Sequence, residues 1–139
     1  MSNPMQDILS YTRSVRLLYV EDNEETRLFT LELLSRFFSD ISVAINGAEG
    51  LELFKNEKYN LVISDINMPL MGGIEMGAKI REIDNKVPII ILSAHNESNY
   101  VESAYNIDIT EYLEKPLDFS QLIDTLKHIS NKQEKEALS

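Results

Sequence analysis

Short apolar runs of strand length recur along the chain. They cover residues 15–20, 41–45, 61–64 and 88–92, with a short fifth candidate at 112–113. Three of these runs are almost continuous in aliphatic and β-branched residues, which is typical of strands buried on both faces of a parallel sheet. The pattern therefore predicts five strands in a parallel sheet.

Segments with helical spacing of apolar residues separate these runs. The predicted helices cover residues 24–38, a segment beginning at Asn46, residues 72–83 and 97–106, and a last segment beginning at Asp118. Asn46 is followed three residues later by Glu49, and Asp118 by Gln121, which is the spacing of a capping box. The apolar side of the first helix is expected to consist of Leu28, Leu31, Leu34 and Phe38.

Strand and helix alternate five times with short connections. Such alternation favours an open parallel sheet covered by helices on both faces, so the expected fold class is α/β, a single doubly wound (βα)5 domain. Its predicted bounds are residues 13–131. Residues 1–12 are expected to form an N-terminal extension, and residues 132–139 a polar C-terminal tail, both peripheral to the domain.

Composition argues against several kinds of partner. The 139 residues include 13 Lys plus Arg and 23 Asp plus Glu, which gives a formal net charge of −10. Nucleic acids and anionic membranes are bound by clustered positive charge, so neither is an expected direct partner. The chain has no cysteine, which removes disulfides and thiolate metal sites. The longest apolar run, 87–92, is far shorter than the roughly 20 residues that span a bilayer, and no signal peptide is visible, so we expect a cytoplasmic protein.

Polar residues with useful chemistry follow four of the predicted strands. Glu21 and Asp22 follow the first strand, Asp65 ends the third, and Ser93 and Lys115 follow the fourth and fifth. Ligands of open α/β sheets bind beyond the carboxyl ends of the strands, so these side chains are expected to share one edge. Crowded carboxylates repel each other, and a hard divalent cation relieves that repulsion. The residues alone suit a Mg²⁺ site that receives a phosphoryl group, although each taken singly is also explained as a helix cap or a solvated charge.

Four short motifs stand in order at the ends of these strands. They are Glu21-Asp22, Asp65-Ile66-Asn67-Met68-Pro69, Ser93-Ala94 and Tyr112-Leu113-Glu114-Lys115-Pro116. Each is weak alone, but together, at these spacings, they resemble the receiver domain of two-component response regulators, the CheY-like superfamily. The resemblance covers about residues 13–131 and implies a flavodoxin-like strand order of 2-1-3-4-5.

The resemblance implies a metal site in the acidic cluster. Asp22 and Asp65 would bind Mg²⁺ directly, together with the main-chain carbonyl of Asn67. Glu21 would act through a water molecule, and Mn²⁺ would be able to replace Mg²⁺.

The same resemblance implies how phosphate is received and sensed. Asp65 would be the phosphoacceptor for a histidine kinase or phosphotransfer protein, Lys115 would pair with the phosphoryl oxygens, and Ser93 would hydrogen-bond to them. Tyr112 would turn inward when Ser93 moves. This movement would remodel the surface of the fourth helix, fifth strand and fifth helix for an unidentified downstream protein.

Other positions bear on details of the reaction and of the loops. Asn67 and His95 stand two residues beyond the acceptor and the serine, where their side chains would modulate hydrolysis. Gly72 replaces the usual Asp of a turn in the family. Asp108 and Ile109 replace the usual Gly-Ala before the fifth strand, which puts the backbone of that loop in doubt, because residues other than glycine tolerate positive φ poorly.

Two other functions stay open. A Mg²⁺-dependent aspartyl-phosphate phosphatase would need a second acid where Asn67 stands. A receiver-like scaffold that never takes phosphate would be expected to lack one of the reactive groups, all of which are present. As a receiver, the protein is expected not to be an enzyme, apart from phosphotransfer to its own Asp65 and self-dephosphorylation.

The predicted output surface carries charge of one sign. Residues 94–114 contain no Lys or Arg, and their acids are Glu97, Glu102, Asp108, Glu111 and Glu114. A two-fold interface sets a surface against itself, so like charges there oppose self-association. We therefore expect a monomer whose partner is basic or uses an apolar anchor near Tyr100, Tyr105 and Tyr112.

Overall fold

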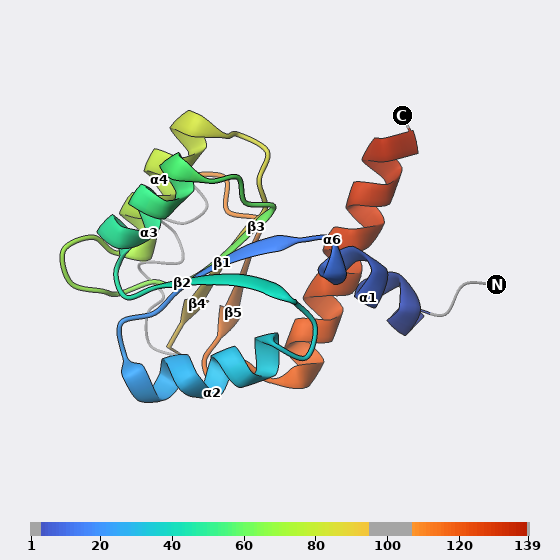
Figure 1. Ribbon diagram of the computed structural model, residues 1–139, viewed down its shortest axis with the longest axis horizontal. Helices are drawn as coiled ribbons and strands as arrows, with labels where there is room; N and C mark the ends of the chain where they lie inside the picture. Colours follow the sequence, from blue (N-terminus) through green and yellow to red (C-terminus); the bar gives the residue numbers. More distant parts are fainter. Residues whose placement is uncertain (1–3, 95–106, 139) are drawn as a thin grey trace.

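The computed structural model describes residues 4–94 and 107–138, with the side chains described as far as residue 133. In chain order, its elements are α1 (Pro4–Arg13), β1 (Arg16–Val20), α2 (Glu24–Leu34), β2 (Asp40–Ala44), α3 (Gly47–Asn56), β3 (Leu61–Asp65), α4 (Gly73–Ile83), β4 (Ile89–Ser93), β5 (Glu111–Glu114) and α6 (Phe119–Leu138) (Figure 1). The helix predicted over residues 97–106 lies outside the described residues.

The five strands form one parallel sheet in the order β2-β1-β3-β4-β5, as expected for this fold class. The central strands β1, β3 and β4 derive from the continuous apolar runs, and their register is regular: Ile63 of β3 pairs with Tyr19 of β1 on one side and with Ile90 of β4 on the other. All five strands point the same way, so their carboxyl ends meet at one edge.

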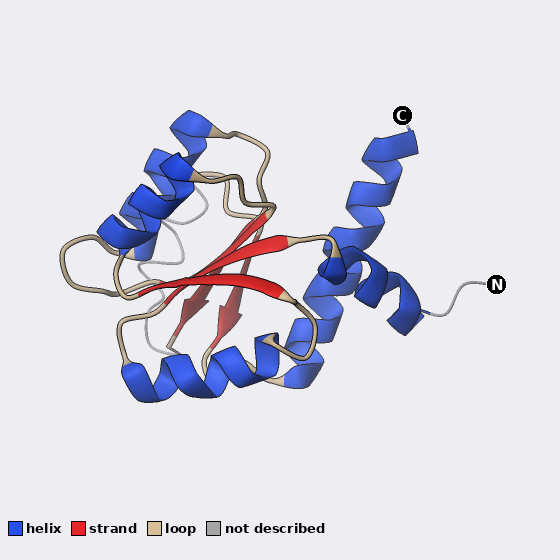
Figure 2. Ribbon diagram, in the orientation of Figure 1, coloured by secondary structure: helices blue, strands red, loops and turns tan. Residues whose placement is uncertain are grey.

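Helices lie on both faces of the sheet (Figure 2), and an apolar core fills the space on each face. Along β1, Leu17 and Tyr19 face one core, which includes residues of α2 and α6, while Leu18 and Val20 face the other, which includes residues of α3 and α4. Because successive side chains of a strand alternate between faces, a strand covered on both faces is expected to be apolar at nearly every position. This explains why the sequence runs are continuous rather than alternating.

Helix α2 differs in two respects from its prediction over residues 24–38. It ends at Leu34, and the amides of Phe37 and Phe38 both donate to the carbonyl of that residue. Leu28, expected on the apolar side, is 61% exposed. Leu34 and Phe38 are buried as predicted, and Leu31 is partly buried. Thr30 and Leu33 are the other buried residues of the helix, so the buried side is turned away from Leu28.

Two terminal segments are more structured than the sequence suggested. Residues 1–12 were expected to be peripheral, but Pro4–Arg13 form helix α1, whose Ile8 is 1% exposed and belongs to the core shared by α2 and α6. Helix α6 continues through the polar tail to Leu138, because Lys, Gln, Glu and Ala are all good helix formers. Among the described helices, none is long and apolar enough to cross a membrane.

In the loop before β5, Asp108 stands where the family usually has a glycine. Asp108 adopts a left-handed backbone, with φ of 58°, which Asp tolerates better than most residues. Its carbonyl accepts two hydrogen bonds from the Arg81 guanidinium, from Nε at 3.0 Å and Nη2 at 2.9 Å. The Arg81 side chain, which belongs to α4, thus fixes the turn that leads into β5.

Candidate functional site

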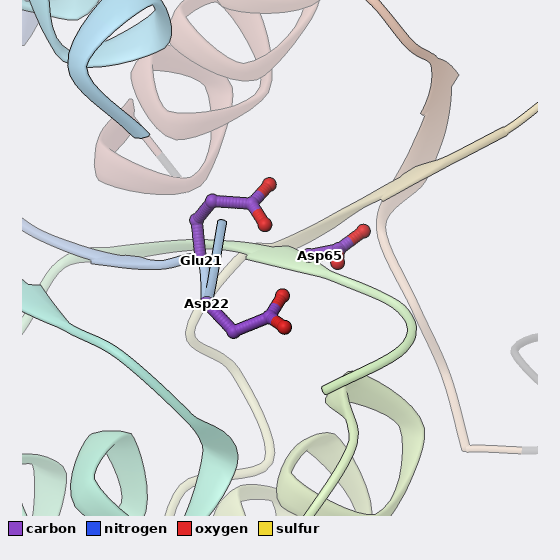
Figure 3. Close-up of side chains that lie close together, drawn as sticks. All are labelled: Glu21, Asp22 and Asp65. Carbon is purple, nitrogen blue, oxygen red and sulfur yellow. The ribbon is translucent and has the colours of Figure 1, made fainter. Parts of the chain in front are cut away.

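Three carboxylates converge at the carboxyl edge of the sheet (Figure 3). Glu21 and Asp22 follow directly after β1, and Asp65 is the last residue of β3, the neighbouring strand. One oxygen from each of the three lies within 4.8 Å of the others. Glu21 and Asp65 are buried, at 0% and 5% exposure, whereas Asp22 is exposed. The structure therefore brings together the three acids that the sequence predicted to meet.

Lys115 joins this cluster from the end of β5. Its Nζ lies 2.8 Å from Oδ1 of Asp65 and 3.0 Å from Oε1 of Glu21. Its main-chain N–H donates to the carbonyl of Ser93 at 2.8 Å, which fixes the backbone of Lys115 against the end of β4. One ammonium thus bridges two buried carboxylates that belong to different strands.

Burial dominates the titration of these groups. It raises the pKa of Asp65, and it raises the pKa of Glu21 with a further contribution from the negative charge of Asp65. Burial alone would lower the pKa of Lys115, but the hydrogen bonds and charges of Asp65 and Glu21 outweigh it and raise that pKa. Lys115 therefore stays charged, while the two acids are only partly compensated.

The donor set fits a hard divalent cation. Three carboxylates face one ammonium, so the cluster keeps an excess of negative charge, and all of its potential ligands are oxygens. Mg²⁺ prefers oxygen ligands and takes one or two carboxylates at phosphoryl-transfer sites. Glu21, Asp22 and Asp65 are the residues that could hold it.

The remaining predicted residues take up different positions around the cluster. Ser93 is buried at the end of β4, and it directly follows Leu92, the residue that pairs with Asp65. Tyr112 on β5 is half-buried against the core shared by α3 and α4. Asn67 is exposed in the loop after β3, and His95 lies outside the described residues. Their roles as switch, hydrolysis and carbonyl-ligand residues stay predictions.

Close backbone packing behind Asp65 was not predicted from the sequence. A Cβ atom at Gly73 would overlap the carbonyl oxygen of Asp65, and one at Gly47 would overlap that of Met71. The amide of Gly73 donates to the carbonyl of Ile66 at 2.9 Å, which closes the loop between β3 and α4. The Gly72-Gly73 pair at the start of the helix predicted over residues 72–83 was the signal available for this close approach.

An apolar groove of about 320 Å³ lies beside Lys115. Helix α2 supplies Thr26, Phe29 and Thr30 to it, and the segment after β5 supplies Pro116 and Leu117. Phe29 is 61% exposed, and with Pro116 and Leu117 it makes the lining mainly apolar. A larger hollow of about 710 Å³ is lined by residues of α1, α6 and the loops before β3 and β4, and none of Glu21, Asp22, Asp65 or Lys115 contributes to it.

Comparison with known proteins agrees with this geometry. The response regulator receiver domain family matches residues 17–127, most of the chain. The chain belongs to this family. The receiver domain is 33% identical over 118 residues to the probable transcriptional regulator ycf29 of Porphyra purpurea, covering 84% of this chain and 56% of that protein. It is 30% identical over 109 residues to a response regulator receiver protein of Anaeromyxobacter, covering 78% of this chain and 46% of that protein.

Solved structures of receiver domains share the architecture. The CheY-like receiver domain protein from Methanospirillum hungatei superposes with a TM-score of 0.80 at 26% identity, over 88% of this chain and 98% of that one. The N-terminal domain of an uncharacterized protein from Wolinella succinogenes has a TM-score of 0.76 at 30% identity, over 86% of this chain and 98% of that one. The receiver domain spans only about half the length of the two curated relatives above.

Proposed function

We propose that this receiver domain accepts a phosphoryl group on Asp65 from a phosphohistidine of a histidine kinase or phosphotransfer protein, in the cytoplasm. The observation that carries the proposal is the bridge made by Lys115, 2.8 Å from Asp65 and 3.0 Å from Glu21, at the carboxyl edge of the sheet. A buried carboxylate on a rigid strand end is a well-positioned nucleophile, and the adjacent ammonium is ready to pair with phosphoryl oxygens.

The transfer would be a displacement at phosphorus. A carboxylate oxygen of Asp65 forms the new bond to phosphorus, and the bond from phosphorus to the donor imidazole nitrogen breaks. The electron pair of that bond stays on the imidazole nitrogen, and the aspartate becomes an acyl phosphate. Such a reaction needs in-line positioning and neutralisation of the phosphoryl oxygens more than it needs covalent help from the protein.

The acidic cluster would hold Mg²⁺ for this reaction. Asp22 and Asp65 would be direct ligands with the main-chain carbonyl of Asn67, Glu21 would act through water, and Mn²⁺ would be a substitute. When bound, the cation supplies positive charge to the phosphoryl oxygens. The support for this assignment is the oxygen-only donor set with its excess of negative charge.

Ser93 and Tyr112 would report the phosphorylated state to a downstream protein. Ser93 ends the strand next to Asp65, which supports a role in which its hydroxyl would bond to a phosphoryl oxygen and draw the end of β4 toward it. Tyr112 on the adjacent β5 would follow into the space that Ser93 leaves. A local gain of charge and acceptor oxygens would thereby bias a larger surface.

The groove beside Lys115 offers a surface for the phosphohistidine donor. It is predominantly apolar, it includes the exposed ring of Phe29, and Lys115 itself forms part of its wall. A donor domain seated there would bring its imidazole close to Asp65 while covering apolar surface.

The protein would act stoichiometrically in this transfer and would not be an enzyme, apart from its self-dephosphorylation.

Labelling with a small phosphodonor tests the proposal. Incubation with acetyl phosphate and Mg²⁺ should add one phosphate, detected by intact-mass spectrometry, and EDTA should prevent it. Asp65→Asn should abolish the label, whereas Asp124→Asn, a matched change at an exposed position on α6, should be labelled normally. Normal labelling of the Asp65 variant would refute the assignment. A wild type that takes no label and binds no beryllofluoride would favour the scaffold function instead.

A further inference from the structure

Arg27 reaches back from α2 to the loop that carries two of the acids. Its Nη1 donates to the main-chain carbonyl of Glu21 at 3.1 Å and to that of Asp22 at 3.4 Å. The side chain is half-buried and lies in the first turns of the helix. A single guanidinium nitrogen therefore contacts both peptide carbonyls that follow directly after β1.

The loop is otherwise held at its two ends. The amide of Glu21 continues the sheet by donating to the carbonyl of Ala44 at 3.0 Å. Beyond the acids, the amide of Asn23 donates to Oε2 of Glu21 at 3.1 Å, and the Asn23 side chain accepts from the amide of Thr26 at 2.8 Å. Between these anchors, the carboxylate of Asp22 is exposed to solvent, and the carbonyl of the same residue is held by Arg27.

We propose that Arg27 is a positioning residue for cation binding: its two hydrogen bonds fix the peptides of Glu21 and Asp22 so that both carboxylates face Asp65. This inference rests on the metal site of the proposed function. Two adjacent side chains can converge on one point only if the peptide between them keeps its orientation, and an anchored carbonyl sets that orientation. Groups that orient metal ligands without touching the metal commonly contribute roughly 10- to 100-fold in metal affinity.

The sign of the effect separates positioning from electrostatics. Arg27 brings a positive charge near the cation site, so through charge alone its removal would strengthen Mg²⁺ binding. Through positioning, its removal weakens binding. A purely structural role would lower the thermal stability without a matching change in affinity at a temperature where the protein is folded.

Calorimetric titration of the unphosphorylated full chain with MgCl₂ tests the proposal. Arg27→Met should raise the Mg²⁺ dissociation constant roughly ten-fold. Arg27→Lys should lie closer to the wild type, because one nitrogen makes both contacts and an ammonium can replace it. The matched control is Arg36→Met, which makes the same charge change at an exposed residue beyond the end of α2. Among the described residues, Arg36 pairs with Glu32 and not with Glu21, Asp22 or Asp65.

Each outcome decides something definite. Unchanged or tighter Mg²⁺ binding by Arg27→Met would overturn the inference, as would a Lys variant as weak as the Met variant. A wild type that binds Mg²⁺ but takes no label from acetyl phosphate would contradict the proposed function and leave the role of Arg27 standing. A wild type that does not bind Mg²⁺ at all would contradict both.

Discussion

A methyl group added at Gly73 should disturb the acceptor aspartate from behind. The Cβ atom would overlap the carbonyl oxygen of Asp65 and would stand 3.2 Å from its carbonyl carbon and 3.1 Å from Oγ of Ser64. Restoring ordinary contact distances requires the start of α4 and the end of β3 to separate by about 1 Å. Backbone atoms surround the added methyl group on that side, so no side-chain rotation can relieve the contact.

Two consequences follow for Gly73→Ala. Overpacking of this kind should cost about 1–3 kcal/mol of the free energy of unfolding, reduced by the small gain in helix propensity. Displacing a reacting group by about 1 Å can reduce a rate roughly 100-fold. We therefore expect acetyl phosphate to label the variant much more slowly than the wild type, as measured by intact mass over time. The comparison is made at a temperature where the variant remains folded, so that loss of stability does not account for the slower labelling.

Gly77→Ala on the same helix is the matched control. Its Cβ would meet the ends of two flexible side chains, Cδ1 of Ile107 at 3.1 Å and Cδ1 of Ile109 at 3.5 Å. These can shift, and replacing a glycine inside a helix gains up to about 1 kcal/mol, so the control should match or exceed the wild type in stability and label normally. A Gly73 variant labelled at the wild-type rate would refute the claim that the close approach of α4 positions Asp65.

Two further predictions concern stability. Burial raises the pKa values of Asp65 and Glu21, so the folded protein loses stability as the pH rises through those values. Asp65→Asn should therefore raise the melting temperature in EDTA at neutral pH, by roughly 4 °C for each kcal/mol gained in the free energy of unfolding. The gain should fade toward about pH 4, where the wild-type carboxyl groups are protonated. A gain that grows on acidification, followed by circular dichroism, would contradict this. Ile8→Ala should lower the free energy of unfolding, measured in urea, by about 2–5 kcal/mol, because Ile8 is 1% exposed in the core. Met5→Ala, on the same helix at 37% exposure, should lower it much less. Equal urea midpoints for the two variants would show that the packing of α1 does not stabilise the domain.

The sheet was predictable because its signal is local. A central strand of a parallel sheet is apolar at nearly every position. The runs that became β1, β3 and β4 show this pattern, apart from polar residues at or next to the strand ends. Helix faces were less predictable, because the sequence offers more apolar residues than the core receives. On α2, the apolar Leu28 is exposed while the polar Thr30 is buried. Helix α1 was missed although Pro4 stands at its first position and Ile8 lies one turn on, because the surrounding polar residues obscured the pattern.

The candidate site was predictable to the extent that topology determines it. Parallel strands deliver their last residues to one edge, so the meeting of Glu21, Asp65 and Lys115 follows from the strand order. The contacts of Arg27 and Gly73 were not predictable in this way. Each depends on how closely a helix approaches the sheet, and that distance is determined by side-chain packing across the whole interface.

The position of Lys115 suggests how a change at Asp65 would reach the rest of the sheet. In this structure, its ammonium is shared between Asp65 and Glu21, and its main-chain N–H is bonded to the carbonyl of Ser93. A phosphoryl group on Asp65, as proposed, would offer the ammonium new oxygens and would also attract the hydroxyl of Ser93. The Lys115 side chain, and Ser93, whose carbonyl is bonded to the Lys115 amide, would then both respond to phosphorylation of Asp65. Because β4 and β5 are paired up to Ser93 and Glu114, a movement at the end of β4 would be passed on to β5. That coupling would connect the buried acids to the edge of the sheet without any direct contact between Asp65 and β5.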